Sequence, residues 1–248
     1  MKPICLYAGG STKACRIAAA ALEAQGAAVV DHPSPDVTHL LLDVPSFLTS
    51  GLLKSGEPLE PLLERLPETI TVIGGNLRHP ALADYKTWDL LQDETYLAEN
   101  AAITAQCTIK AAAPLLDTTF SQCPTLILGW GRIGKALGKL LTAIGCPVTI
   151  AARNPAHRAM LQALGYEAVD IPQAQALLPK MGLVVNTVPH PVLSCRDFSG
   201  QSLDLSSVQG LTGEGVIWAR GLPGELAPRS SGNLIAETVA RLEKEAAS

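Results

Sequence analysis

The chain has 248 residues, of which 47% are hydrophobic, 17% charged and 4% aromatic, and its formal net charge is −4. This length fits one or two domains, and the apolar residues suffice for a core built mainly from Ala, Leu, Val and Ile. A negative net charge gives no electrostatic case for binding nucleic acid, which requires a basic surface. No apolar run approaches the roughly 18 residues that indicate a membrane span, so we predict none.

The cysteines and the first residues of the chain indicate a cytoplasmic protein. No two of the six cysteines form a C-x-x-C pair, and their spacings match no zinc site. We therefore expect small buried thiols in a reducing compartment, and no metal. The apolar run at 4–7 is very short and is followed by Gly9-Gly10, which is not the pattern of a signal peptide. We also expect a homo-oligomer.

Residues 1–92 are predicted to form a small α/β domain. Its helical segments cover 13–26, which is closed by Gly26, and 58–67, which is bordered by prolines. Strands that alternate with helices are typical of a parallel sheet. The expected strands are short apolar runs at 4–7, 27–32, 38–45 and 69–75.

A long helix over 93–116 is predicted to link this domain to a second α/β domain at 117–229. Asp93 can cap that helix, and Glu94 suits the positive end of its dipole. In the second domain, strands and helices alternate again, with strands at 125–129, 148–153, 167–170, 183–189 and 215–224 and helices at 132–145, 155–165 and 172–181. A last amphipathic helix over 230–246 is expected to pack back on the first domain.

The most informative motif is a glycine-rich turn after the first strand of the second domain. Gly129, Gly131 and Gly134 fit G-x-G-x-x-G between an apolar strand and an amphipathic helix, which is the context that a dinucleotide-binding turn needs. The first glycine permits the turn, the second lets a pyrophosphate approach, and the third lets helix and strand pack closely. We therefore predict two Rossmann-like α/β domains with parallel sheets, the second binding a dinucleotide through Gly129, Trp130, Gly131, Arg132, Ile133 and Gly134.

The end of the following strand indicates which dinucleotide is bound. NAD-binding versions place an acidic residue there to accept from the ribose 2′-hydroxyl. Here the strand ends in Ala151-Ala152-Arg153-Asn154, without a carboxylate. Arg153, together with Arg158 and with His157 nearby, can hold a 2′-phosphate, because guanidinium groups match phosphate in charge and shape. We therefore expect NADP(H) in preference to NAD(H), with Arg153, Asn154 and Arg158 at the cofactor.

A later strand ends in the turn Asn186-Thr187-Val188-Pro189. Ligands of this fold lie beyond the carboxyl ends of the strands, so these four residues are expected to meet the nicotinamide half of the cofactor. The alternative is that Asn186 only caps the turn, and the sequence does not decide between the two.

Three segments resemble the A subunit of bacterial dipicolinate synthase. They are the run from Leu126 to Arg153, the NTVP turn at 186–189, and above all GLPGELAPRSSG at 221–232. YLAENAAITA at 96–105 is also similar to the interdomain helix of that family, where a Glu matches Glu99. The resemblance covers about residues 90–248 well, and it matches the first domain mainly through its first strand and Gly9-Gly10.

The resemblance implies a two-domain enzyme built like the 2-hydroxyacid dehydrogenases, with its active site between the domains. It would oxidise dihydrodipicolinate, a dicarboxylate-like small substrate, to dipicolinate with NADP during sporulation, together with a small flavoprotein-like second subunit. It also implies that Gly221, Leu222 and Pro223 contribute to the cofactor site. The chain departs from the family in two places: a segment after Ser207 is shortened, and Ser11 stands where the family has an acidic residue.

Hydride transfer also requires a group that moves a proton. His190, at the carboxyl end of the sheet, and Glu99 are the catalytic candidates, although His190 also fits an exposed loop between prolines and Glu99 a solvated helix face. Asn100, Arg229 and Ser231 are the candidates for the substrate, because Arg229 and Ser231 lie at the start of the last helix, whose N-terminus can hold a carboxylate.

Two alternatives remain open at the level of sequence. A shikimate-dehydrogenase-like NADPH reductase shares the arginine at the strand end and a V-N-x-x-P turn, but no convincing Lys–Asp pair is found in the first domain. A non-catalytic nucleotide-binding subunit is favoured by the shortened segment after Ser207 and by Ser11.

Overall fold

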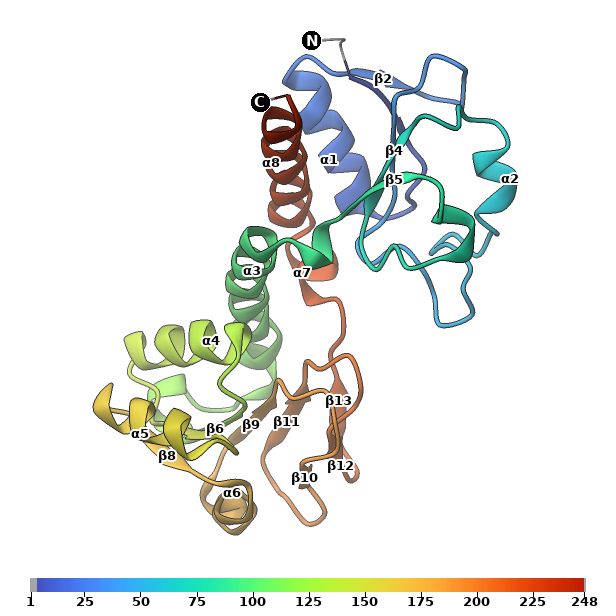
Figure 1. Cartoon of the computed structure of the whole chain (residues 1–248). Coiled ribbons are helices and arrows are strands. Elements are labelled where there is room, and N and C mark those ends of the chain that lie inside the picture. The colour runs from blue at the N-terminus through green and yellow to red at the C-terminus, as the bar shows by residue number, and fades with distance from the viewer. Residues whose placement is uncertain (1–3, 248) are drawn as a thin grey trace. The chain divides into compact units, whose positions relative to one another are not determined.

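The computed structural model describes residues 4–247, which fall into two compact units (Figure 1). Unit 1 combines the residues up to Asn100 with those from Pro223 onward, and unit 2 comprises Ala101–Leu222. The chain therefore passes from one unit to the other twice, once within helix α3 (Glu94–Ala112) and once at the start of α7 (Leu222–Leu226). No helix within the described residues is long and apolar enough to cross a membrane.

Unit 1 is built on a five-stranded parallel sheet of order β2-β1-β3-β4-β5. The strands are short, and β3 and β4 are buried along their whole length: β1 (Cys5–Ala8), β2 (Ala28–Val30), β3 (His39–Leu41), β4 (Thr71–Gly74) and β5 (Lys86–Asp89). Helices α1 (Lys13–Ala24) and α2 (Glu60–Leu63) connect them, with short 3-10 turns at Pro80–Leu82 and Leu90–Gln92. The 2-1-3-4-5 order is that of the flavodoxin-like α/β folds, whose switch point lies between the first and third strands.

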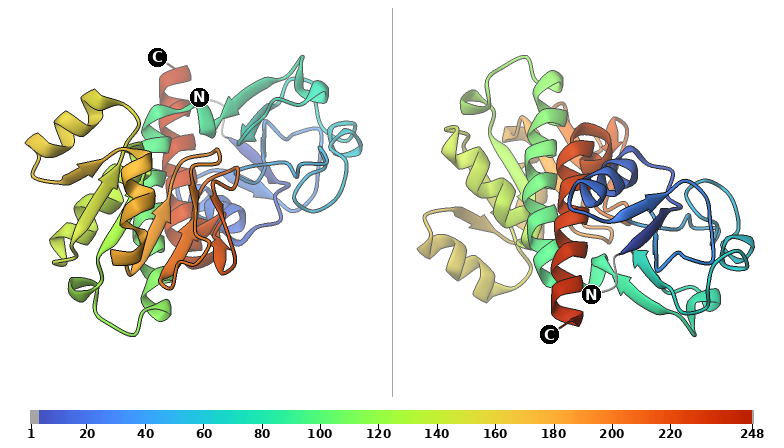
Figure 2. Two further views of the ribbon diagram at one scale, coloured as in Figure 1. Left: turned by 90° about the horizontal axis from the view of Figure 1, so that it is seen from below. Right: turned by 90° about the horizontal axis from the view of Figure 1, so that it is seen from above.

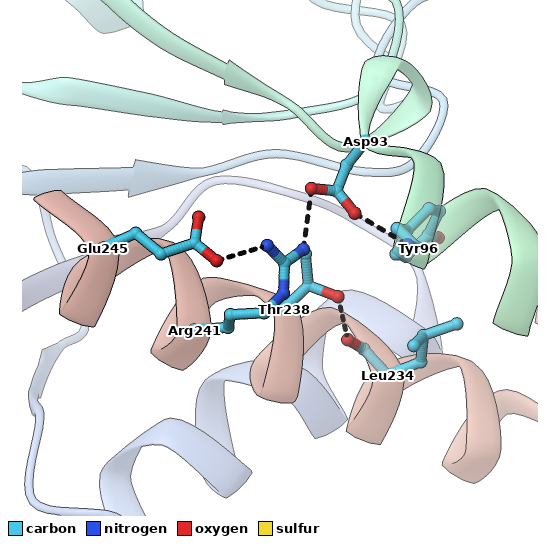
Figure 3. Close-up of polar contacts among 6 residues, drawn as sticks. All are labelled: Asp93, Tyr96, Leu234, Thr238, Arg241 and Glu245. Atoms are coloured by element: carbon cyan, nitrogen blue, oxygen red, sulfur yellow. Dashed lines mark hydrogen bonds and ion pairs between the residues drawn. The ribbon is translucent and has the colours of Figure 1, made fainter.

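The last helix, α8 (Pro228–Ala246), packs against α1 within unit 1 (Figure 2, right). The two helices approach closely at Gly232, where a β-carbon would lie 2.7 Å from the carbonyl oxygen of Ala14. Arg241 of α8 donates to Asp93 at 2.7 Å and to Glu245 at 2.9 Å (Figure 3). Burial raises the pKa of Asp93, but the hydrogen bonds from Arg241 and from the amide of Tyr96 outweigh it, and the pKa lies below its usual value.

Unit 2 has a six-stranded parallel sheet of order β13-β11-β9-β6-β7-β8. This arrangement has the reversal of strand order seen in dinucleotide-binding domains, and the switch point lies between β6 and β9. The strands are β6 (Thr125–Leu128), β7 (Val148–Ala151), β8 (Glu167–Val169), β9 (Leu183–Asn186), β11 (Gln201–Asp204) and β13 (Val216–Trp218). A small ladder pairs β10 (Leu193–Ser194) with β12 (Leu211–Thr212).

The helices of unit 2 are α4 (Arg132–Ala143), α5 (Pro155–Ala163), α6 (Ile171–Leu177) and the greater part of α3, with 3-10 turns at Ala113–Leu115, Phe120–Gln122 and Leu178–Lys180. An apolar cluster covers each face of the sheet, so its central strands are buried on both sides. Ile127 and Val185 belong to one cluster, and Leu126 and Val184 belong to the other.

The predicted fold class, two α/β units with parallel sheets, is confirmed. Several details differ from the sequence prediction. Strands β5, β10, β11 and β12 were not expected, and the segment at 215–224 forms a strand only over Val216–Trp218 before helix α7 begins. The last helix begins at Pro228 and not at 230, so Arg229 and Ser231 lie in its first turn and do not precede it.

Candidate nucleotide-binding site

The glycine turn joins β6 to α4 at the switch point of the unit 2 sheet. Gly129 has φ +104°, and a β-carbon there would lie 2.5 Å from the Thr187 hydroxyl oxygen, so the turn requires glycine. A β-carbon on Gly134 would collide with the carbonyl oxygen of Gly129, so only glycine at this position allows the helix to lie this close to the turn. Gly131 differs, because a β-carbon there would meet nothing within 4 Å.

Gly131 is also the N-cap residue of α4, and it offers no side chain to the amides of the first turn. Those amides have no acceptor within the helix, and together with the helix dipole they form a site for an anion. The open space beside Gly131 is therefore where the diphosphate of a dinucleotide can meet the backbone.

A pocket of about 620 Å³ opens in front of this turn. Its walls come from the carboxyl ends of β6, β7 and β9 and from the residues that follow them, which is the position of ligands in this fold. The lining residues are Gly129, Trp130, Gly131, Ala151, Ala152, Arg153, Asn154, His157, Ile171, Thr187, Val188, Pro189 and Val192. Of the predicted cofactor residues, Gly129, Trp130, Gly131, Arg153, Asn154, Thr187, Val188 and Pro189 are thus brought together around one pocket.

The β7 end of the pocket carries the basic residues. Arg153 is exposed, and Asn154 caps α5 by accepting from the amide of Ala156 at 2.9 Å. Arg158 does not line the pocket. Its Nη1 donates to the carbonyl oxygens of Ala152 at 2.8 Å and Arg153 at 2.7 Å, so it braces the strand end from behind.

The opposite wall is the turn after β9. Asn186 is fully buried; its amide nitrogen donates to Val188 O and to Asp204, both at 3.0 Å, and its oxygen accepts from the Val188 amide. Asn186 therefore shapes the turn and does not line the pocket, which agrees with the capping alternative. The Thr187 hydroxyl donates to Leu128 O at 2.8 Å and so ties this turn to the end of β6.

Asp204, at the end of β11, was not identified from the sequence as a site residue. Its carboxylate is fully buried and accepts from Asn186, from the amides of Ser206, Gly210 and Leu211 at 3.0, 2.6 and 2.8 Å, and from the Ser206 hydroxyl. A buried carboxylate is stable only with such donors. The segment after Ser207 is therefore anchored by Asp204, which also bonds to Asn186 at the pocket wall.

His190 lies in an adjoining hollow of about 310 Å³ whose wall includes Arg153 and Asp170. Its Nδ1 lies 3.2 Å from the carbonyl oxygen of Pro191, and its Nε2 is buried with no hydrogen-bond partner among the described residues. Asp170 caps α6 by accepting from the Gln173 amide at 2.9 Å. The structure thus places His190 near the arginine at the strand end.

The remaining predicted residues do not line the glycine-turn pocket. Arg132 and Ile133 begin α4 with their side chains outside it, and Gly134 is buried beneath the turn. Glu99 is exposed and Asn100 half-buried on α3. Gly221, with φ +69°, precedes Leu222 and Pro223 at the start of α7, while Arg229 is exposed and Ser231 buried in α8.

The cysteines show no sign of nucleophilic activation. Cys15, Cys107, Cys123, Cys146 and Cys195 are buried free thiols, and Cys5 is half-buried. Burial raises the pKa of Cys15 to about 12 and also raises the pKa of Cys123, Cys146 and Cys195. These thiols are therefore protonated at neutral pH. Within residues 4–247, no group of three or more metal-ligating side chains is gathered.

Together, the fold and the site define a protein of two α/β units, of which the second has the strand order, glycine turn and open pocket of a dinucleotide-binding domain. No protein-family model matches the chain. In sequence, the chain is 27% identical over 175 residues to the A subunit of dipicolinate synthase from Bacillus subtilis strain 168. The matched region is 65% of this chain and 59% of that protein, so it spans less than two thirds of the relative's length.

Solved structures show the same architecture over nearly the whole chain. The A subunit of dipicolinate synthase from Bacillus halodurans is 21% identical with a TM-score of 0.81, and the match covers 97% of each chain. Its counterpart from Bacillus subtilis is 21% identical with a TM-score of 0.80, covering 99% of this chain and 97% of that one. The transhydrogenase of Sinorhizobium meliloti is 12% identical, with a TM-score of 0.66 over 96% of this chain and 92% of that one. The resemblance to the A-subunit family of dipicolinate synthase is confirmed.

Proposed function

We propose that this protein is an NADP(H)-dependent oxidoreductase that resembles the A subunit of dipicolinate synthase and oxidises dihydrodipicolinate to dipicolinate. The observation that carries the proposal is the open glycine-turn pocket, with Arg153 at one end and no carboxylate at the strand end. The sequence match to the dipicolinate synthase protein supports the reaction, and the strand order of unit 2 supports the cofactor class.

The residues of the pocket fit a dinucleotide, because Gly131 leaves the space that a side chain would fill. The amides at the start of α4 would hold the diphosphate, and Arg153 would hold the 2′-phosphate. Thr187, Val188 and Pro189 would border the cofactor on the β9 side. The bound nicotinamide supplies a hydride acceptor or donor.

For the proton that accompanies hydride transfer, we propose Glu99 or His190, and for the substrate carboxylates Arg229, Ser231 and Asn100. We place Gly221, Leu222 and Pro223 at the cofactor by the same resemblance. Because the relative is one component of a synthase, we further propose a second, flavoprotein-like component as partner. Replacing Glu99 by Gln, measured with the partner present, separates the two acid–base candidates. If Glu99 carries the proton, kcat falls while nucleotide affinity is unchanged; if His190 carries it, kcat stays as in wild type.

A direct test is a fluorescence titration of the purified chain with NADPH and with NADH. We expect NADPH to bind more tightly, and Arg153→Ala to weaken NADPH by roughly tenfold while changing NADH by less than about twofold. Equal losses for both nucleotides would contradict the assignment of Arg153. Absence of binding by either nucleotide would contradict the function as a whole.

Two other functions are tested with the same preparation. Rapid reduction of 3-dehydroshikimate by NADPH would favour a shikimate-dehydrogenase-like enzyme. Tight NADPH binding without turnover of dihydrodipicolinate, even with the partner present, would favour a non-catalytic nucleotide-binding subunit.

A further inference from the structure

Two basic side chains follow Arg153 in the first turns of α5, and the structure gives them different positions. Arg158 donates through Nη1 to Ala152 O at 2.8 Å and Arg153 O at 2.7 Å. His157 lines the glycine-turn pocket together with Arg153 and Asn154, and it is exposed. The guanidinium of Arg158 therefore supports the backbone, while the imidazole of His157 faces the pocket.

The position of His157 in the helix explains this arrangement. Asn154 is the N-cap of α5, so His157 is the third residue of the helix. Side chains in an α-helix are tilted toward its N-terminus, and here the N-terminus is the end of β7 that carries Arg153. The imidazole is thus directed to the place where a group on the adenosine ribose would meet Arg153.

We propose that His157, and not Arg158, is the second side chain that recognises the 2′-phosphate, and that it adds to the preference for NADP over NAD. The inference rests on the proposed function, because it assigns a phosphate of that cofactor. A ring N–H of an imidazole can donate to a phosphate oxygen, and NAD offers no phosphate at this position. Arg158 is a positioning residue that holds the strand end in place.

Other charged groups on the neighbouring elements are common to every variant that is compared. Lys135 of α4 lies 5.9 Å from the centre of the Trp130 ring, and Glu167 of β8 accepts from Thr149 at 3.0 Å. Arg153 and Asp170 border the adjoining hollow of His190. A comparison of wild type with His157→Leu therefore isolates the contribution of the imidazole.

The test is calorimetric titration of wild type and of His157→Leu with NADP⁺ and NAD⁺, which differ only in the 2′-phosphate. We expect the NADP⁺/NAD⁺ affinity ratio of His157→Leu to be roughly tenfold smaller than that of wild type, because leucine offers no donor to the phosphate. Adenosine 2′,5′-bisphosphate and AMP should show the same difference. His32→Leu, at an exposed histidine of unit 1, is the matched control and should behave as wild type.

Arg158→Met gives the opposite pattern if the assignment is correct. It should lower thermal stability and weaken both nucleotides by a similar factor, which leaves their ratio unchanged. A ratio that falls in Arg158→Met but not in His157→Leu, or a ratio in His157→Leu equal to that of wild type, would overturn the inference while leaving the proposed function intact. If neither nucleotide bound to wild type, both the inference and the proposed function would fall.

Discussion

Each unit of this protein places a glycine-containing turn after its first strand, at the switch point of a parallel sheet, but the two turns are used differently. In unit 2, Gly131 faces an open pocket. In unit 1, the turn after β1 is closed by Asp43, which follows β3 and accepts from the amides of Ser11 and Thr12 at 2.9 and 3.0 Å and from both of their hydroxyls.

Asp43 therefore places an internal anion where an external one would bind. Its carboxylate lies at the N-terminus of α1, and a β-carbon on Gly10 would come within 2.8 Å of its Oδ1. A helix N-terminus favours a negative charge whether it comes from a ligand or from the chain itself. A strand–glycine–helix turn therefore becomes a binding site only where the chain leaves the anion position open.

The largest expected effect comes from giving unit 2 an internal anion of its own. Gly131→Asp places a carboxylate at the start of α4, and the fold should tolerate it because a β-carbon there meets nothing within 4 Å and φ is −82°. Repulsion between like charges should weaken NADPH binding at least about a hundredfold. Gly131→Ala, measured by the same fluorescence titration, separates charge from bulk and should lose much less. If Gly131→Asp bound NADPH as tightly as wild type does, the proposed difference between the two turns would be wrong.

A second prediction concerns the buried carboxylate that braces the pocket wall of unit 2. Asp204→Asn turns one acceptor oxygen into a donor that faces backbone amides, and it should lower the free energy of unfolding by about 3 kcal/mol. Urea unfolding measures this loss. NADPH affinity should fall only several-fold, because Asp204 acts on the pocket through Asn186. An unchanged unfolding midpoint would show that the segment at 205–211 is held by other contacts.

A smaller effect is expected for the corresponding carboxylate of unit 1. Asp43→Asn keeps one acceptor, and the bonds it loses are partly exposed, so we expect a loss of about 2 kcal/mol in urea unfolding. NADPH affinity should stay within about twofold of wild type if nucleotide binds at the glycine turn of unit 2 and not at the turn after β1. A large loss of NADPH affinity in this variant would place part of the nucleotide site at the turn after β1.

The sequence predicted the parts of this molecule that depend on local pattern. The glycine turn, the apolar strands and the arginine at the end of β7 are short, contiguous signals, and the pocket gathers most of the residues that carry them. Strand β11, Gln201–Asp204, was missed because four residues with polar ends show no clear periodicity. The start of α8 was placed too late because Pro228 and Arg229 resemble a loop, although proline is favoured in the first turn of a helix.

Long-range partners could not be predicted. Asp43 meets Thr12 across 31 positions, and Asp204 meets Asn186 across 18, so neither pairing leaves a local pattern. The same limit applies to Arg158 and His157, which are adjacent basic residues in the sequence. Only the backbone geometry at the end of β7 determines which of them bonds to carbonyl oxygens and which faces the pocket.

The central claim is that the glycine-turn pocket of unit 2 holds the nucleotide, and that it prefers the form with a 2′-phosphate. The most direct measurement is a calorimetric titration of the wild-type chain with NADPH and then with NADH. The account predicts one site per chain, with NADPH bound more tightly than NADH. Two sites per chain, or no heat of binding with either nucleotide, would contradict it.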